Sequence, residues 1–155
     1  MKKSFLIVIL FVFALNACKK DENKCPEVTA KAPASEVENL RTYIEDNNII
    51  AVEDARGFFY SIDVPAAGSK PTSCSYVTVD YVGKLTNGTV FDSNNNISFD
   101  LSGLILGWQE GIPLIASGGS ITLYLPPSLA YGSSANGSIP ANSNMIFNIN
   151  LKSFN

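Results

Sequence analysis

The sequence predicts an α+β domain in which several antiparallel strands accompany one short internal helix. Polar and apolar residues alternate along most of the chain after residue 57, which is the period of a half-buried strand. The dipeptide Asn87-Gly88 follows one such stretch and is a strong signal for a hairpin turn. After residue 100, one short segment, Trp108–Ile115, has the character of a helix. Together these observations indicate one strand-rich domain.

The composition suits such a domain. The chain has 155 residues, of which 46% are hydrophobic and 16% are charged, enough for one proper core. The net charge is -3 and no long run of Lys or Arg occurs, which argues against nucleic acid as the main partner. The sequence contains no histidine, and this removes Ser-His-Asp and Cys-His catalysis and histidine zinc sites. We expect no metal and no cofactor.

The first residues have the pattern of an export signal. Two lysines precede an apolar stretch, Phe5–Leu15, which is shorter than the about 20 residues that a membrane-spanning helix needs. It ends in Leu15-Asn16-Ala17-Cys18, which resembles the lipobox of bacterial lipoproteins, where the chain is cut before a cysteine that carries a lipid. We expect a signal peptide over residues 1–17 and a lipid on Cys18 that anchors the protein in the outer membrane. The alternative is an ordinary signal peptide.

Residues 18–34 have no periodic apolar pattern and are expected to form a flexible tether. Lysines followed by acidic residues after Cys18 resemble a surface-export signal but fit a plain solvated linker equally well, so the periplasmic and the surface-exposed location both stay open. Cys25 and Cys74 remain. In an oxidising compartment they could form a disulfide or persist as two free thiols.

The folded part is expected to begin with a helix. Ser35 and Glu38 have the spacing of a capping box, and apolar side chains then recur at helical intervals. We expect this helix over residues 35–46, ended by Asn47-Asn48 and followed by a lead-in as far as residue 56.

Several strands are expected between residue 57 and the end of the chain. Each is an apolar or alternating run bounded by turn residues. They cover residues 58–64, residues 77–81, a piece that starts at Phe99 and Leu101, residues 121–125 and residues 145–151. Pro65 and Pro126-Pro127 end the first and the fourth of them.

Most familiar catalytic motifs are missing or incomplete. Residues 92–96 begin like a calcium loop, but Ile97 and Gly103 stand where such a loop needs glycine and glutamate. Gly118-Gly119 lacks the lysine and the helix of a phosphate loop, and no G-x-S-x-G or S-x-x-K pattern occurs. What remains is a high density of aromatic residues beside apolar ones, for which core packing is the ordinary explanation.

Several motifs resemble those of FKBP-type peptidyl-prolyl cis-trans isomerases, in that family's order and at nearly its spacings. They are Tyr81, Phe91-Asp92-Ser93, Gly107-Trp108-Gln109-Glu110-Gly111, Pro127-Ser128-Leu129-Ala130-Tyr131-Gly132 and Met145-Ile146-Phe147-Asn148-Ile149-Asn150-Leu151. The resemblance covers residues 57–155. It implies a bent antiparallel sheet wrapped around one short helix, and the helix that precedes this part looks like the lead-in of bacterial envelope members.

The resemblance also implies a cup that receives a proline ring. Tyr131 would offer its hydroxyl to the substrate carbonyl and Asp92 would add a fixed dipole, so that Asp92, Tyr131 and Tyr81 are the expected catalytic residues. The expected substrate-binding residues are Phe91, Phe99 and Phe147 in the walls, Leu104 and Ile105 at the rim, Trp108 at the floor and Ile139 on a flap.

These expectations describe an isomerase that rotates X-Pro bonds in exported, unfolded proteins and assists their folding in the cell envelope. Its partners would be proline-containing peptides, macrolide inhibitors of the family, and the membrane through the lipid on Cys18. Two alternatives differ in class: a module that holds proline segments without catalysis, and an unrelated lipid-anchored glycan binder that uses its aromatics for stacking.

Overall fold

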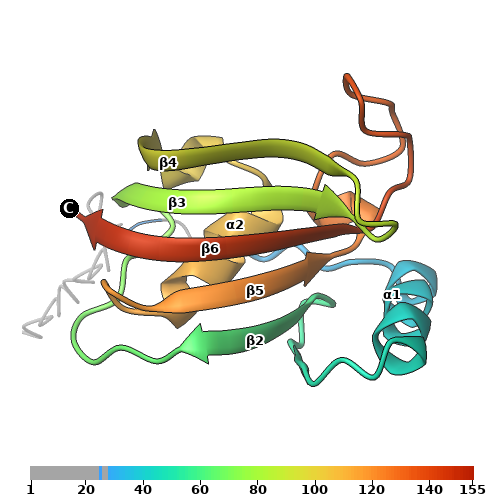
Figure 1. Ribbon diagram of the computed structural model, residues 1–155, viewed down its shortest axis with the longest axis horizontal. Helices are drawn as coiled ribbons and strands as arrows, with labels where there is room; N and C mark the ends of the chain where they lie inside the picture. Colours follow the sequence, from blue (N-terminus) through green and yellow to red (C-terminus); the bar gives the residue numbers. More distant parts are fainter. Residues whose placement is uncertain (1–24, 26–27) are drawn as a thin grey trace, which may run out of the picture.

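The computed structural model describes residue 25 and residues 28–155, and it contains one six-stranded antiparallel sheet (Figure 1). The strands are β1 (Val52–Glu53), β2 (Phe59–Val64), β3 (Tyr76–Leu85), β4 (Val90–Asp100), β5 (Ser120–Leu125) and β6 (Met145–Phe154). Their order in the sheet is β1-β2-β5-β6-β3-β4, so the C-terminal strand β6 is inserted between β5 and β3. The expected signal peptide and Cys18 lie outside the described residues.

Helix α2 (Leu106–Gly111) lies against one face of the sheet, behind the strands in Figure 1. Two glycines allow its close approach to β5. A Cβ atom on Gly107 would lie 2.4 Å from Leu125 Cδ1, and one on Gly111 would lie 2.6 Å from Leu123 Cδ1. Any side chain at these positions would therefore push the helix away from the sheet. This arrangement confirms the expected α+β fold, a sheet built around one short helix.

Helix α1 (Ala34–Asp46) packs on the opposite face. Its apolar stripe contacts Phe59 of β2, Tyr124 of β5 and Ile146 of β6. Tyr124 alternates with residues that face α2, so its side chain points to the other side of the sheet. Strand β5 is buried on both faces, since Tyr124 is covered by α1 and Thr122 is hydrogen-bonded to Asp63 and Asn148.

The start of α1 differs from the expected capping box. Pro33 occupies the N-cap position, and no side chain of the described residues caps the helix. Glu38 pairs with Arg41 instead. Glu36 Oε2 accepts a hydrogen bond from the backbone N–H of Ser128 (2.9 Å), which ties the first turn of α1 to the segment after β5. The helix ends before Asn47 and Asn48, as predicted.

Part of the expected tether is attached to the domain. The backbone N–H of Ala32 donates to the carbonyl of Arg56 (2.9 Å), and Ala30 and Ala32 pack against the core. A disulfide joins Cys25 to Cys74 just before β3. The expected flexible tether over residues 18–34 is thus held to the domain at Ala30 and Ala32, which the sequence did not indicate because isolated alanines give no periodic pattern. No helix in the described part of the chain is long and apolar enough to span a membrane.

The hairpin between β3 and β4 turns at Asn87-Gly88 as predicted, with Gly88 at a φ of 89°. Strand β4, however, ends where the sequence predicted a strand to begin, and Leu101–Gly103 form a 3₁₀ turn. Asp100 causes this ending, since its side chain accepts hydrogen bonds from the N–H and the hydroxyl of Ser102 (3.0 and 2.7 Å). Such local bonds favour a turn over a strand.

The internal helix is also displaced from its predicted position. Helix α2 starts at Leu106, before the predicted Trp108, and a 3₁₀ turn over Ile112–Leu114 continues it. Pro113 explains the change of winding, because proline has no N–H to donate within a helix. The earlier start places Trp108 within the first helical turn, where its side chain faces the sheet.

Candidate active site

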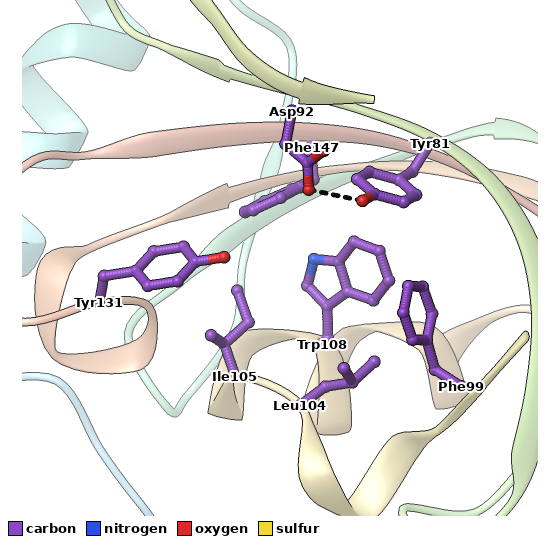
Figure 2. Close-up of a pocket in the computed structure, with 8 residues that line it drawn as sticks. All are labelled: Tyr81, Asp92, Phe99, Leu104, Ile105, Trp108, Tyr131 and Phe147. Carbon is purple, nitrogen blue, oxygen red and sulfur yellow. Dashed lines mark hydrogen bonds between the residues drawn. The ribbon is translucent and has the colours of Figure 1, made fainter. Parts of the chain in front are cut away.

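A cavity of about 170 Å³ lies between α2 and the sheet, and Figure 2 shows the side chains that converge on it. They come from segments far apart in the sequence. The lining residues are Tyr81 of β3, Asp92 and Phe99 of β4, Leu104 and Ile105 before α2, Trp108 of α2, Tyr131 after β5, and Phe147 of β6. All of them are residues that the sequence predicted for the cup.

Trp108 forms the floor of the cavity. Its side chain is 4% exposed, and its ring makes edge contacts with Tyr81 and Phe147 at centroid distances of 5.1 and 5.3 Å. Phe99 contacts the same ring at 6.1 Å. Edge-to-face contacts of this kind hold an aromatic ring in one orientation. The indole N–H is buried without a hydrogen-bond partner among the described residues, so the floor presents an unused donor.

Tyr81 and Asp92 form the polar edge. The Tyr81 hydroxyl donates a hydrogen bond to Asp92 Oδ2 at 2.6 Å, drawn as a dashed line in Figure 2. Burial raises the pKa of Tyr81, and the hydrogen bond to the Asp92 carboxylate raises it further. Tyr81 therefore stays protonated at every physiological pH, and it holds the carboxylate in one position at the edge of the cavity.

Tyr131 enters the cavity from the side opposite Phe99, with its hydroxyl directed inward (Figure 2). The residue follows a 3₁₀ turn, Pro127–Leu129, that begins directly after β5. Burial raises the pKa of Tyr131, and the negative charge of Asp92 raises it as well. The hydroxyl stays protonated and has no hydrogen-bond partner among the described residues, so it is available as a donor to a ligand.

Leu104 and Ile105 form the rim. Ile105 is the N-cap residue of α2, and an N-cap N–H takes no part in the hydrogen bonds of its helix. The rim thus combines two aliphatic side chains with a main-chain donor. The side chain of Gln109, one turn along α2, reaches back to this segment and donates to Leu104 O at 2.7 Å. Gln109 was not predicted as a site residue, because a glutamine gives no signal for the bonds it makes.

Two predicted cup residues do not line the cavity. Phe91 lies behind it, with ring centroids 5.6 Å from Phe147 and 6.4 Å from Tyr131, so it supports two lining residues. Ile139 is 6% exposed and packs in the main core. Ile139 does not line the cavity: its backbone pairs with Asn136 within a loop whose residues 133–138 are exposed, and the Ile139 side chain turns inward from that loop to the core.

The chemistry of the lining is that of a binding cup. Apolar rings and chains surround a small volume, with two phenol hydroxyls and one carboxylate at its edge. Within residues 25 and 28–155, no three Cys, Asp or Glu side chains are grouped so that they could hold a metal ion. Such a cup suits an apolar ring that enters it while an adjacent carbonyl oxygen meets the donors.

Fold and cavity thus define an α+β domain with an aromatic cup that has room for one small ring. Residues 68–152 match the FKBP-type peptidyl-prolyl cis-trans isomerases, and the chain belongs to that family. A relative named FkpA from Buchnera aphidicola is 46% identical over 100 residues, which are 61% of this chain and 40% of the relative. The chain spans about two fifths of the length of the curated relatives that it matches.

Solved structures agree with this assignment. The crystal structure of FkpA from Escherichia coli has a TM-score of 0.70 and 32% sequence identity, over 78% of this chain and 60% of that one. A peptidyl-prolyl cis-trans isomerase from Pseudomonas syringae has a TM-score of 0.69 and 28% identity, over 81% of this chain and 98% of that one.

Proposed function

We propose that this protein is a peptidyl-prolyl cis-trans isomerase that accelerates rotation about X-Pro bonds in exported polypeptides and so assists their folding. The observation that carries the proposal is the aromatic cup, with the Tyr131 hydroxyl directed into it and Asp92 fixed at its edge. Membership in the isomerase family supports it. The same cup is proposed to bind the macrolide inhibitors of that family.

The reaction needs no nucleophile. Rotation about an X-Pro bond breaks no covalent bond but crosses a barrier of about 20 kcal/mol, which the resonance of the planar amide creates. That resonance separates charge, and water stabilises it. A cup floored by Trp108 and walled by Phe99 and Phe147 excludes water from the bond, which favours the twisted amide over the planar one.

The polar groups act on the carbonyl as it turns. In this mechanism the Tyr131 hydroxyl and the Ile105 N–H donate to the substrate carbonyl oxygens and hold the peptide while the bond rotates. The Asp92 carboxylate, fixed by Tyr81, adds a stationary negative charge that acts on the carbonyl dipole. Because the Asp92 charge is in place before the bond turns, it needs no reorganisation during the reaction, and its contribution falls on the transition state.

An isomerisation assay with short X-Pro peptides tests the proposal on the full-length chain in mild detergent. Tyr131→Phe removes one hydrogen bond to substrate and is expected to lower kcat/KM about tenfold, which corresponds to about 1.4 kcal/mol. Asp92→Asn keeps an acceptor for Tyr81 but removes the charge, and should lower the rate in the same direction. Tyr76→Phe is the matched control, because Tyr76 is 52% exposed and does not line the cavity.

A folded wild-type protein without measurable activity contradicts the proposal. If that protein still bound proline peptides, it would be a non-catalytic binding module on the same fold. An equal loss in Tyr131→Phe and Tyr76→Phe would contradict the role given to Tyr131.

We further propose that residues 1–17 are removed as a signal peptide and that Cys18 carries a lipid that anchors the protein in the outer membrane. The apolar stretch Phe5–Leu15 and the Leu15-Asn16-Ala17-Cys18 sequence support this anchor. Its clients would then be unfolded proteins of the envelope, reached from either the periplasmic or the outer face.

The anchor predicts a specific mass and a specific fractionation. Mass spectrometry of the protein made in a Gram-negative host should find Cys18 as the first residue with a diacylglyceryl group, and the protein should sediment with outer membranes. Cys18→Ser should abolish both properties. A soluble wild-type protein that starts at another residue would exclude the lipoprotein and leave an ordinary signal peptide.

A further inference from the structure

We propose that Gln109 is a positioning residue that clamps the rim of the cavity to its floor. The inference rests on the proposed isomerase function, since it concerns the geometry in which that site meets a peptide. It goes beyond that function because Gln109 does not line the cavity and acts only through its neighbours.

The Gln109 side-chain amide makes two hydrogen bonds to the rim. Its Nε2 donates to Ser102 O at 3.1 Å and to Leu104 O at 2.7 Å. Both acceptors are carbonyl oxygens, so the NH₂ end of the amide is the only end that fits. One side chain thereby joins two backbone carbonyls that flank Gly103.

Leu104 and Ile105 pack against the core, but few other hydrogen bonds hold the backbone of the rim segment. Leu104 and Ile105 are extended, with ψ angles of 176° and 147°, so they lie outside the repeating hydrogen bonds of a helix. The backbone bond from Leu104 N–H to Leu101 O is long at 3.2 Å. A Cβ at Gly103 would contact nothing within 4 Å, so no packing fixes the segment at that point. The two bonds from Gln109 restrain the backbone at Ser102 and Leu104, on either side of this open point.

The clamp connects the rim to the floor because Gln109 follows Trp108 directly. Trp108 and Gln109 also donate their backbone N–H groups to Ile105 O, at 2.9 and 3.2 Å. The side-chain bonds of Gln109 extend this connection to Ser102 and Leu104. They fix the distance from Leu104 and Ile105 to the Trp108 ring, and hence the width of the cup and the direction of the Ile105 N–H.

Gln109→Met tests the clamp, because methionine has a similar length and no donor. Contacts at the rim hold the peptide in its ground state and in its transition state alike. We therefore expect kcat/KM to fall about tenfold, mainly through a higher KM. Gln109→Lys restores a donor of sufficient length and should recover most of the loss.

A second readout does not depend on activity. Trp108 is the only tryptophan of the chain, so its fluorescence reports on the floor of the cavity directly. A loosened rim should make Trp108 more accessible to acrylamide in Gln109→Met than in the wild type, at a temperature where both are folded. Asn148→Ala is the matched control: it also loses one amide donor, to Thr122 Oγ1 at 2.7 Å, but on the strands and away from the cavity. It should leave KM and quenching unchanged.

The outcomes separate the two proposals. A wild type without isomerase activity would contradict the proposed function. The quenching experiment would still test the clamp, because it does not depend on activity. An active wild type with unchanged KM and unchanged quenching in Gln109→Met would overturn the clamp alone. Equal effects in Gln109→Met and Asn148→Ala would show a merely structural role and would overturn it too.

Discussion

Trp108→Ala is expected to abolish most of the proposed isomerase activity and to destabilise the domain. The Trp108 side chain is 4% exposed and contacts three aromatic rings of the cavity. Truncation of a buried tryptophan costs about 3–5 kcal/mol of folding free energy. It also removes the surface on which a proline ring rests, and burial of a ring of that size contributes about 1.5–3 kcal/mol. We expect kcat/KM to fall at least about tenfold.

The two effects can be separated with a control on the other face of the sheet. Phe59 is equally buried at 4% exposure but packs against α1. Phe59→Ala should lower the melting temperature by a similar amount and leave kcat/KM intact at a temperature where it is folded. Both variants would be assayed well below their transitions, as monitored by circular dichroism. Near wild-type activity in a folded Trp108→Ala would show that the cavity is not the reaction site.

Glu110 is expected to make the stability of the protein fall as the pH rises from 5 to 8. The residue is 2% exposed, and neither of its carboxylate oxygens has a hydrogen-bond partner among the described residues. Burial raises the pKa of Glu110 to about 7; of the charges that face it, Arg56 lowers the pKa and Asp54 raises it. The folded protein therefore binds a proton that the unfolded chain has already released at pH 6.

The direction follows from that difference in proton binding. Where the folded state holds more protons than the unfolded state, the free energy of unfolding decreases with pH. A pKa raised from its ordinary value of 4.5 to about 7 corresponds to about 2–3 kcal/mol of unfolding free energy lost between pH 5 and pH 8. The Asp54 carboxyl has a lowered pKa because of Arg56, so its contribution is lost only at more acidic pH. The sequence has no histidine to titrate in this window.

Urea unfolding at pH 5, 6, 7 and 8 measures this dependence. Glu110→Gln should flatten it, because glutamine does not ionise. Glu45→Gln is the control, since Glu45 is exposed on α1 and should leave the slope as in the wild type. A wild-type stability that is constant or rises over this range would contradict the prediction, as would the same slope in Glu110→Gln.

The strands show what an alternating sequence pattern can predict and what it cannot. Alternation located β2, β3, β5 and β6, because residues on the two faces of a strand meet different surroundings. The pattern failed to show that both faces of β5 are buried, because Tyr124 packs with α1 and Thr122 is hydrogen-bonded to Asp63 and Asn148. It also failed at the end of β4, where one Asp100 side chain forms a turn. The periodicity of a sequence indicates which residues share one face of a strand, but not which other segments cover that face.

The site residues were likewise predicted only in part. The lining residues were predicted from motifs that resemble those of one family. Each motif consists of particular residue types in a fixed order, so it can be recognised in the sequence. Phe91 belongs to one of these motifs, yet its ring lies behind the cavity. Ile139 lies near the motifs in the sequence, yet its side chain packs in the core. Their side-chain types suit a cup and a core equally, so only the packing of the chain could separate the two positions.

By itself, therefore, the sequence determined the α+β class, the turn at Asn87-Gly88, the absence of histidine chemistry and the set of rings from which the cup is made. Those properties depend on residue type and local spacing. The tertiary structure alone decided the insertion of β6 between β5 and β3, the bond between Tyr81 and Asp92, the bonds from Gln109 to Ser102 and Leu104, and the burial of Glu110. Each of these joins or encloses residues through contacts with other segments, and no local pattern records which distant neighbour a side chain will meet.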